Sequence, residues 1–591
     1  MDPGLDGDSI TLKTARPTTR PGIRRTAIPS SLLLWILPLA FLGIFYFFPM
    51  LEIMRASFSR GEAGLVGALA AALTSPSTLS VIAFTFYQAA LSTILSLLIG
   101  LPGAYLLARY DFRGKSALRA LTAVPFVLPT LVVAAAFNAL LGPSGWLNLA
   151  LMEPFSLSEP PIRIMNTLAA ILLAHVFYNT TIVLRLVGDF WARLDPTVEE
   201  AARVLGANRF QTARLVTFPL LSPAIIAATL LVFLFNFTSF GVILILGGPR
   251  FATIEVEIYY QTVSLFNLPL AAALALIQLA CTLALAVVYT RLSRRVTRPL
   301  AVRSPRQNLR KLRTWRERLG AGILLTVLFA LLIMPLAALA LRSVSRITPE
   351  RGQRAAPARG LTLDFYRALS ESHPDSLFYA PPTEAISNSL EYAAVTVVLA
   401  LALGLPAAWA LARDRRSRWD TAIDPIIMLP LGTSAVTLGL GFILALSRPP
   451  LDLRASPWLV PLAHTLVAFP FVVRILTPSL HSIQPRLREA AAVMGASPLR
   501  VRRHIDLPLV GRALLVAAAF AFTISLGEFG ATALVARPEN PTVPVLIFRF
   551  LSQPGALNYG QALALSTILM AVTAAGILAI ERLRVADIGE F

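Results

Sequence analysis

The chain has 591 residues, of which 56% are hydrophobic and only 14% are charged, and its mean hydropathy is +0.69. This composition excludes a set of soluble globular domains and favours a protein embedded in a lipid bilayer. The formal net charge of +20 at pH 7 would suit a nucleic-acid binder, so the placement of the basic residues decides between the two classes.

Apolar stretches long enough to cross a membrane recur along the whole chain, since about 20 apolar residues span the hydrocarbon core as a helix. Six lie in the first half, near residues 31–52, 80–108, 121–142, 166–187, 221–247 and 270–290. Six more lie near residues 320–341, 387–412, 424–446, 458–478, 509–536 and 560–580. The sequence therefore predicts an all-α polytopic membrane protein with about 12 transmembrane helices.

Basic residues gather in alternate loops, for example at Arg24, Arg113, Arg310 and Arg582. The positive-inside rule explains this pattern and places these loops and both termini in the cytoplasm, so we expect no nucleic-acid partner. The loop 344–386 is long enough to be translocated whatever its charge.

An internal repeat becomes visible when 289 is added to a residue number. Leu173-Ala174-His175 then becomes Leu462-Ala463-His464, and Phe240-Gly241 becomes Phe529-Gly530. Each half holds an even number of spans, so the repeat is parallel and a substrate path is expected between the halves. The expected organisation is a cytoplasmic N-terminal tail (1–30), a first permease domain (31–295), a basic cytoplasmic linker (296–318) and a second permease domain (319–591).

A polar segment between the fourth and fifth spans carries the signals of two short helices. Asp195 can cap the first turn, Pro196 suits the first helical position, and Gly206 can adopt the left-handed conformation that ends a helix. A second helix is expected to start at Asn208. The second half repeats these signals with other residues: Pro485, Gly495, Ser497 and Pro498.

These two segments resemble the EAA loop of the permeases of binding-protein-dependent ABC importers. The first copy reads Glu200-Ala201-Ala202, Gly206, Pro219, and the second reads Glu489-Ala490-Ala491, Gly495, Pro508. The first copy departs from the family pattern only by apolar exchanges at Val216 and Phe218. The resemblance implies the type I importer permease fold, also called MetI-like, with loops that dock on an ATPase subunit and with Glu200 and Glu489 able to pair with its basic groups.

The same resemblance implies the partners: two copies of an ABC ATPase subunit, an extracytoplasmic solute-binding protein and the bacterial cytoplasmic (inner) membrane. This chain contains no G-x-x-x-x-G-K-[ST] loop, because Arg109 stands where the first glycine before Gly114-Lys115-Ser116 would be. We therefore expect a transport subunit that is not an enzyme and binds no cofactor, with ATP and Mg on the partner ATPase. No metal site is expected, since no Cys or His cluster has ligand spacing.

The fused form, with Phe240-Gly241, Gly247-Gly248-Pro249 and Thr253-Ile254-Glu255, resembles the ferric iron and thiamine permease group. This resemblance implies that one of these solutes crosses the membrane by ATP-driven alternating access. An ion-coupled secondary transporter with parallel repeats is the alternative, since such carriers also contain repeats. A structural membrane scaffold is a third reading.

Polar residues within the apolar stretches are candidates for a substrate path, because ionisable groups in the bilayer are costly. Glu528 lies inside the predicted eleventh span and corresponds to Ser239, which neighbours Asn236 and Thr238. These four residues could line a route for a cationic solute, or they could form interhelical hydrogen bonds. His175 and His464 are expected to pack or hydrogen-bond, because a duplicated residue is typical of architecture.

Overall fold

The computed structural model describes residues 32–58, 72–122, 124–296, 309–347, 360–371, 381–413, 418–447, 449 and 451–585. The predicted tail (1–30), residues 297–308 of the predicted linker, and residues 348–359 and 372–380 of the long loop lie outside these residues. The four domain boundaries stay a prediction.

In the first half, the polypeptide forms long helices joined by short ones. The elements are α1 (Leu32–Leu42), η1 (Gly43–Phe47), α2 (Phe48–Phe58), α4 (Pro76–Arg109), β1 (Tyr110–Asp111), α5 (Lys115–Leu121), α6 (Val124–Val127), α7 (Thr130–Leu141), α8 (Trp146–Phe155), α9 (Leu168–Arg193), α10 (Thr197–Val204), α11 (Arg209–Thr212), η2 (Ala213–Thr217), α12 (Phe218–Phe237), α13 (Gly241–Leu246), α14 (Ile254–Val263) and α15 (Leu268–Val296).

The second half repeats this order after the strand β2. Its elements are β2 (Arg310–Lys311), α16 (Trp315–Leu332), α17 (Met334–Ser343), α18 (Asp364–Arg367), α19 (Pro382–Leu411), α20 (Arg418–Met428), η4 (Leu429–Gly432), α21 (Ala435–Ala445), α22 (Leu459–His481), α23 (Pro485–Val493), α24 (Pro498–Val501), η5 (Arg502–Asp506), α25 (Leu507–Leu509), α26 (Gly511–Gly527), α27 (Thr532–Val535), α28 (Val543–Leu551) and α29 (Ala556–Val585).

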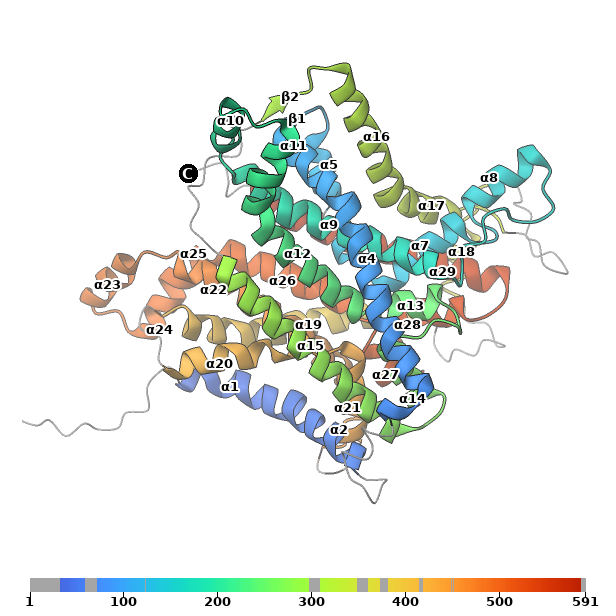
Figure 1. Cartoon of the computed structure of the whole chain (residues 1–591). Helices are drawn as coiled ribbons and strands as arrows, with labels where there is room; N and C mark the ends of the chain where they lie inside the picture. Colours follow the sequence, from blue (N-terminus) through green and yellow to red (C-terminus); the bar gives the residue numbers. More distant parts are fainter. Residues whose placement is uncertain are drawn as a thin grey trace, which may run out of the picture.

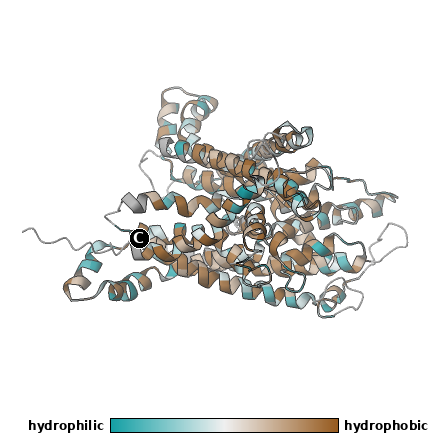
Figure 2. Ribbon diagram, turned by 90° about the horizontal axis from the view of Figure 1, so that it is seen from below, coloured by the Kyte–Doolittle hydropathy of each residue, from teal (hydrophilic) through white to brown (hydrophobic). Residues whose placement is uncertain are grey.

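The helices form a bundle in which the long elements lie side by side (Figure 1). Among the described residues, ten helices are long and apolar enough to cross a membrane, or twelve if each of two bent pairs is one span. Hydrophobic residues run along these helices, while hydrophilic residues gather on the projecting pieces and loops (Figure 2). The prediction of an all-α polytopic membrane protein is therefore confirmed.

Several predicted spans are interrupted where an apolar run continues. The third does not run over 121–142, because α6 ends before Pro129 and the spanning helix starts at Thr130. The ninth, predicted over 424–446, is a pair of helices bent by 96°. The fifth starts earlier, at Arg209, and ends at Phe237, and the eleventh ends at Gly527. Glu528 therefore lies just after a helix, and the prediction that it lies inside one was wrong.

The first span of each half packs against the other half. Helices α1 and α2 lie on α19 and α21, while α17 lies on α7 and α16 on α4. The hydroxyl of Tyr46 in η1 lies 2.8 Å from that of Thr433, so a buried hydrogen bond joins the two halves. The halves are thus interlocked by an exchange of their first spans.

Close helix packing inside each half depends on a glycine at the same place of the repeat. A Cβ at Gly100 would lie 2.6 Å from the Cβ of Val183, and a Cβ at Gly404 would lie 2.5 Å from Cγ1 of Val472. Both distances are too short for carbon atoms, so only glycine lets α4 approach α9 and α19 approach α22 this closely.

Candidate coupling elbows and central cavity

We call residues 195–219 elbow 1 and residues 484–508 elbow 2. In elbow 1, a carboxylate oxygen of Asp195 accepts a hydrogen bond of 3.0 Å from the backbone N–H of Thr197, where α10 begins. Pro196 takes the cap position and not the predicted first helical position. Gly206 ends the helix with a φ of +92°, and Asn208 forms a reciprocal capping box with Gln211.

Elbow 2 reaches the same shape with different residues. Pro485 opens α23, Gly495 ends it with a φ of +82°, and Pro498 opens α24. Ser497 occupies the cap position of α24, but its side chain makes no capping hydrogen bond there. The two elbows project at the same side of the bundle, away from α8 and α18 (Figure 1).

Both elbows present apolar side chains to the outside at matching positions of the repeat. Val204 and Leu205 correspond to Val493 and Met494, and these four side chains are 81–88% exposed. Phe210 and its counterpart Leu499 are also exposed. Exposed apolar groups that cluster in this way are typical of a surface that another protein covers.

A charged contact inside each elbow ties its first helix to the helix that follows. In elbow 1, Glu199 accepts hydrogen bonds from Arg109 at 2.8 Å and from the hydroxyl of Thr217 at 3.0 Å. In elbow 2, Arg488 donates to Asp506 at 2.8 Å. Arg488 is the counterpart of Glu199, and Asp506 is that of Thr217, so the charge is reversed while the contact is kept.

The glutamates of the motif differ in their surroundings. Glu200 pairs with Arg310 of the chain's own linker at 2.9 Å, whereas Glu489 forms no ion pair among the described residues. In elbow 1 the linker therefore lies against the motif glutamate, and the expected pairing of Glu200 and Glu489 with basic groups of a partner stays a prediction. Ala491 is buried, Ala202 half-buried, and Ala201 and Ala490 exposed. Pro219 and Pro508 lie in the first turns of α12 and α25.

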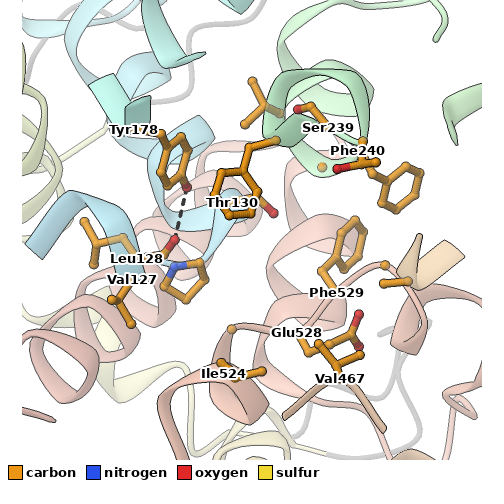
Figure 3. Close-up of a pocket in the computed structure, with 18 of the residues that line it drawn as sticks. Val127, Leu128, Thr130, Tyr178, Ser239, Phe240, Val467, Ile524, Glu528 and Phe529 are labelled. Carbon is orange, nitrogen blue, oxygen red and sulfur yellow. Dashed lines mark hydrogen bonds between the residues drawn. The ribbon is translucent and has the colours of Figure 1, made fainter. Parts of the chain in front are cut away.

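A central cavity of about 390 Å³ lies between the halves and is lined by residues of both. Figure 3 shows it, with Phe240 and Phe529 facing each other and the Tyr178 hydroxyl bonded to the carbonyl of Leu128. The two phenyl rings are repeat counterparts, stacked at 5.4 Å with an interplanar angle of 18°. The cavity is mostly apolar with a few convergent polar groups, as in many ligand sites.

The candidate path residues all line this cavity. Ser239 accepts or donates a 2.8 Å hydrogen bond with Nε2 of His175. Its counterpart Glu528 accepts from the backbone N–H groups of Ala531 and Thr532 at 2.8 and 3.0 Å, and its carboxylate lies 3.3 Å from Nε2 of His464. The two histidines therefore hold equivalent cavity residues, as expected for architectural residues.

Asn236 and Thr238 are held by hydrogen bonds to their own surroundings. The side-chain oxygen of Asn236 accepts from Asn179 at 2.6 Å, and its amide nitrogen donates to Thr93 at 3.3 Å. The hydroxyl of Thr238 donates to the carbonyl of Leu234 at 3.0 Å. Both residues thus line the cavity. Asn236 also forms the interhelical hydrogen bonds considered as the alternative, whereas the bond of Thr238 stays within the end of its own helix.

A second carboxylate, that of Glu255, was missed as a site residue by the sequence reasoning. It is 1% exposed and lines the cavity. Its carboxylate accepts hydrogen bonds from Gln278 of α15 at 2.9 Å and from Ser434 of the second half. Its position in the run Thr253-Ile254-Glu255, between two predicted spans, gave no sign of its burial.

Comparison with known proteins gives relatives along almost the whole chain. The thiamine transport system permease protein ThiP of Escherichia coli (strain K12) is 29% identical over 518 residues, which cover 83% of this chain and 88% of that protein. ThiP of Brucella suis biovar 1 is 29% identical over 539 residues, covering 89% and 90%. A probable ABC transporter permease protein, y4fN of Sinorhizobium fredii, is 27% identical and covers 91% and 94%.

The crystal structure of a bacterial ABC transporter involved in the import of the acidic polysaccharide alginate aligns with 45% of this chain and 96% of that chain, at 19% identity and a TM-score of 0.39. The family model described as the binding-protein-dependent transport system inner membrane component matches residues 97–298 and 400–584, one stretch in each half and together more than half of the chain. The chain therefore belongs to the family of inner membrane components of binding-protein-dependent transport systems.

Proposed function

We propose that this chain is the transmembrane permease subunit of an ATP-driven thiamine importer in the bacterial cytoplasmic (inner) membrane. It works with two copies of an ABC ATPase subunit, which bind ATP and Mg, and with an extracytoplasmic solute-binding protein. The paired elbows with their matching exposed apolar side chains carry the proposal. Family membership favours this importer over the ion-coupled secondary transporter and the structural scaffold.

Each elbow is built to pass a displacement to the cavity. Helix α11 continues through η2 into α12 without a break, so residues 209–237 form one spanning helix. The end of that helix lines the cavity with Phe235 and Asn236. In the second half α24 leads through a bend of 73° into α26, whose Thr523 and Gly527 line the same cavity. An ATPase subunit that moves both elbows would thereby rearrange the cavity from both sides.

The docking surface on each elbow consists of the repeated motif and its exposed neighbours. Glu200, Ala201, Ala202, Gly206 and Pro219 belong to the first ATPase contact, and Glu489, Ala490, Ala491, Gly495 and Pro508 to the second. Leu205 and Met494 are the apolar anchors, because exposed apolar side chains at the centre of an interface contribute most of its binding energy. The elbows and both termini are cytoplasmic, and the solute-binding protein docks at the opposite end.

The substrate assignment follows from the relatives and the cavity. Proteins named as thiamine permeases match along most of their length. Thiamine is a positively charged heteroaromatic molecule, which suits a cavity that holds carboxylates and aromatic rings. Glu528 and the Phe240–Phe529 pair are the contacts that we assign to it, with Asn236, Thr238 and Ser239 beside them. Ferric iron is the second candidate.

The ATPase contact is tested by replacing both anchors, Leu205→Asp with Met494→Asp, and measuring how much cognate ATPase co-purifies with the chain. We expect at least about a tenfold loss, because a charge at the centre of an interface is desolvated without a partner. Phe155→Asp, at an exposed site of α8 on the opposite side, is the matched control and should retain the ATPase. Unchanged recovery of ATPase with the double variant would contradict the proposal.

The substrate is tested in proteoliposomes that contain this chain, its ATPase and its binding protein. Radiolabelled thiamine should accumulate only when ATP is supplied. Accumulation of ferric iron without thiamine would overturn the thiamine assignment while leaving the importer assignment intact. Accumulation that follows an ion gradient and needs no ATPase would overturn the importer itself.

A further inference from the structure

A second cavity, of about 820 Å³, lies beside elbow 1 and takes no part in the path described above. Its walls come from the end of α4 (Tyr105), from β1 (Tyr110), from the end of α9 (Trp191), from elbow 1 and from the linker around β2. It exists because β2 pairs in parallel with β1, which brings Arg310 beside Tyr110 and Lys311 beside Asp111. In the part of the chain that the structure describes, β1 and β2 form the only sheet, so elbow 2 has no such pair of strands beside it.

One side of this cavity is strongly basic. Five cationic side chains line it: Arg203, Arg209, Arg310, Lys311 and Arg313. Two acidic residues also line it: Glu199 pairs with Arg109, and Glu317 accepts from the backbone N–H groups of Arg313 and Thr314 and interacts electrostatically with Arg209. Among the described residues, only Arg310 of the five cations forms an ion pair. A surplus of positive charge therefore faces the cavity.

The other side is aromatic. The rings of Tyr105 and Trp191 lie 5.1 Å apart and those of Tyr105 and Tyr110 lie 5.8 Å apart. Trp191 is 8% exposed, and its indole N–H is buried without a hydrogen-bond partner. Burial raises the pKa of Tyr110 to about 12, so its phenol stays neutral at physiological pH. The cavity thus combines the free indole N–H of Trp191, the aromatic rings, and guanidinium groups that form no ion pair. This combination is typical of a ligand site.

We propose that this cavity binds a phosphate ester, with its phosphate on the Lys311 and Arg313 side and its organic part against Tyr105 and Trp191. Guanidinium and ammonium groups bind phosphate oxygens through charge-assisted hydrogen bonds. The ester is either a soluble heteroaromatic phosphate of nucleotide size or the headgroup of an anionic phospholipid, since basic pockets at the cytoplasmic ends of spanning helices also hold headgroups. The site is independent of the transported solute.

The position of the cavity connects it to elbow 1. Arg310 lines the cavity and also holds Glu200, and Arg203 lies on α10 itself. A ligand between β2 and α10 would therefore restrain elbow 1 against the linker, while elbow 2 stays free. Binding of the ligand in this cavity would therefore restrict the movement of elbow 1 and leave that of elbow 2 unchanged.

The test uses the full-length chain purified in neutral detergent, with the double variant Lys311→Gln and Arg313→Gln. Arg316→Gln is the matched control, because Arg316 belongs to the same segment and does not line the cavity. For the soluble source, adenosine monophosphate is titrated calorimetrically. For the lipid source, native mass spectrometry counts the phosphatidylglycerol retained from mixed nanodiscs, with phosphatidylcholine as reference.

We expect the double variant to weaken binding at least about tenfold and Arg316→Gln to change it by less than about twofold, because unscreened cations at the phosphate dominate such sites. Tyr105→Leu should weaken adenosine monophosphate and leave phosphatidylglycerol unaffected, which separates the two sources. If the wild-type chain retains neither probe, or if the double variant binds as well as the wild type, the proposal is overturned.

Discussion

The two elbows share one shape and differ in the chemistry that holds it. Elbow 1 uses an acid on its first helix, Glu199, and elbow 2 uses a base at the same place, Arg488. Among the described residues, the linker forms an ion pair with elbow 1, and a sharp bend follows elbow 2 but not elbow 1. What both keep is a polar bridge from the first helix to the start of the next span. The comparison indicates that the elbow needs a bridge at this position. Whether the residue on its first helix is an acid or a base is not important.

Removing the base of each bridge gives the largest expected difference between the elbows. The carboxylate side chain that each substitution leaves behind is 5% exposed in Asp506 and 15% exposed in Glu199. Arg488→Gln should lower the free energy of unfolding by about 3 kcal/mol, because it leaves the buried carboxylate of Asp506 without its charge partner. Arg109→Gln should cost about 1–2 kcal/mol, since Glu199 is half-buried and keeps its hydrogen bond from Thr217. Denaturant unfolding of the purified chain measures both, and equal losses would contradict the ranking.

The cavity offers the next comparison, between Glu528 and its counterpart Ser239. Glu528→Gln places an amide NH₂ among the N–H groups of Ala531 and Thr532, so a donor would face donors. We expect the transport rate to fall about tenfold, which corresponds to about 1.4 kcal/mol, with membrane insertion unchanged. Ser239→Ala removes one hydrogen bond to His175 and should reduce transport by less than about threefold. The uptake rates of both variants in proteoliposomes, relative to the wild type, measure the two reductions.

The turn glycines test what the elbows have in common. Gly206 and Gly495 both have positive φ, and neither has a neighbour that a Cβ would meet. Gly206→Ala and Gly495→Ala should therefore each cost about 1 kcal/mol, from backbone strain alone. Thermal unfolding should show the same shift for the two variants. A much larger loss at either position would mean that the elbows are not equivalent in their turn geometry.

The smallest expected effect concerns the motif glutamates. Glu200 and Arg310 are about half exposed, so the pair should contribute less than about 1 kcal/mol. Glu200→Gln should change unfolding by a few tenths of a kcal/mol, with a dependence on salt, and Glu489→Gln should not change it measurably. Measurements at low and high ionic strength separate the two. A salt-independent loss for Glu489→Gln would indicate a contact that the exposed side chain does not make here.

The sequence was sufficient for the helical class, the repeat and the elbows, because hydropathy, a constant offset and capping residues can be read from residue identities without knowing any contact. The interruptions near Pro129, Ser239, Ser434 and Glu528 could not be placed, since the apolar composition continues across them. Proline alone is no guide, because Pro102 and Pro406 lie within continuous helices.

Contacts between segments that lie far apart in the chain could not be predicted from the sequence either. The approach of Arg310 to Glu200 joins residues 110 positions apart, and the bond between Ser434 and Glu255 joins residues 179 apart. Hydropathy also hid the burial of Glu255, because that residue lies between two predicted spans. The charge-reversed bridges could have been suspected from the repeat, since Glu199 and Arg488 occupy equivalent positions.

The exchange of first spans has a consequence for how the molecule holds together. Helices α1 and α2 pack on α19 and α21, and α17 packs on α7, so each half contributes its first span to the other half. If the backbone were cut between the halves, the two fragments would therefore stay associated. The linker is thus not needed as a tether, and its sequence is free to serve as a wall of the basic cavity beside elbow 1.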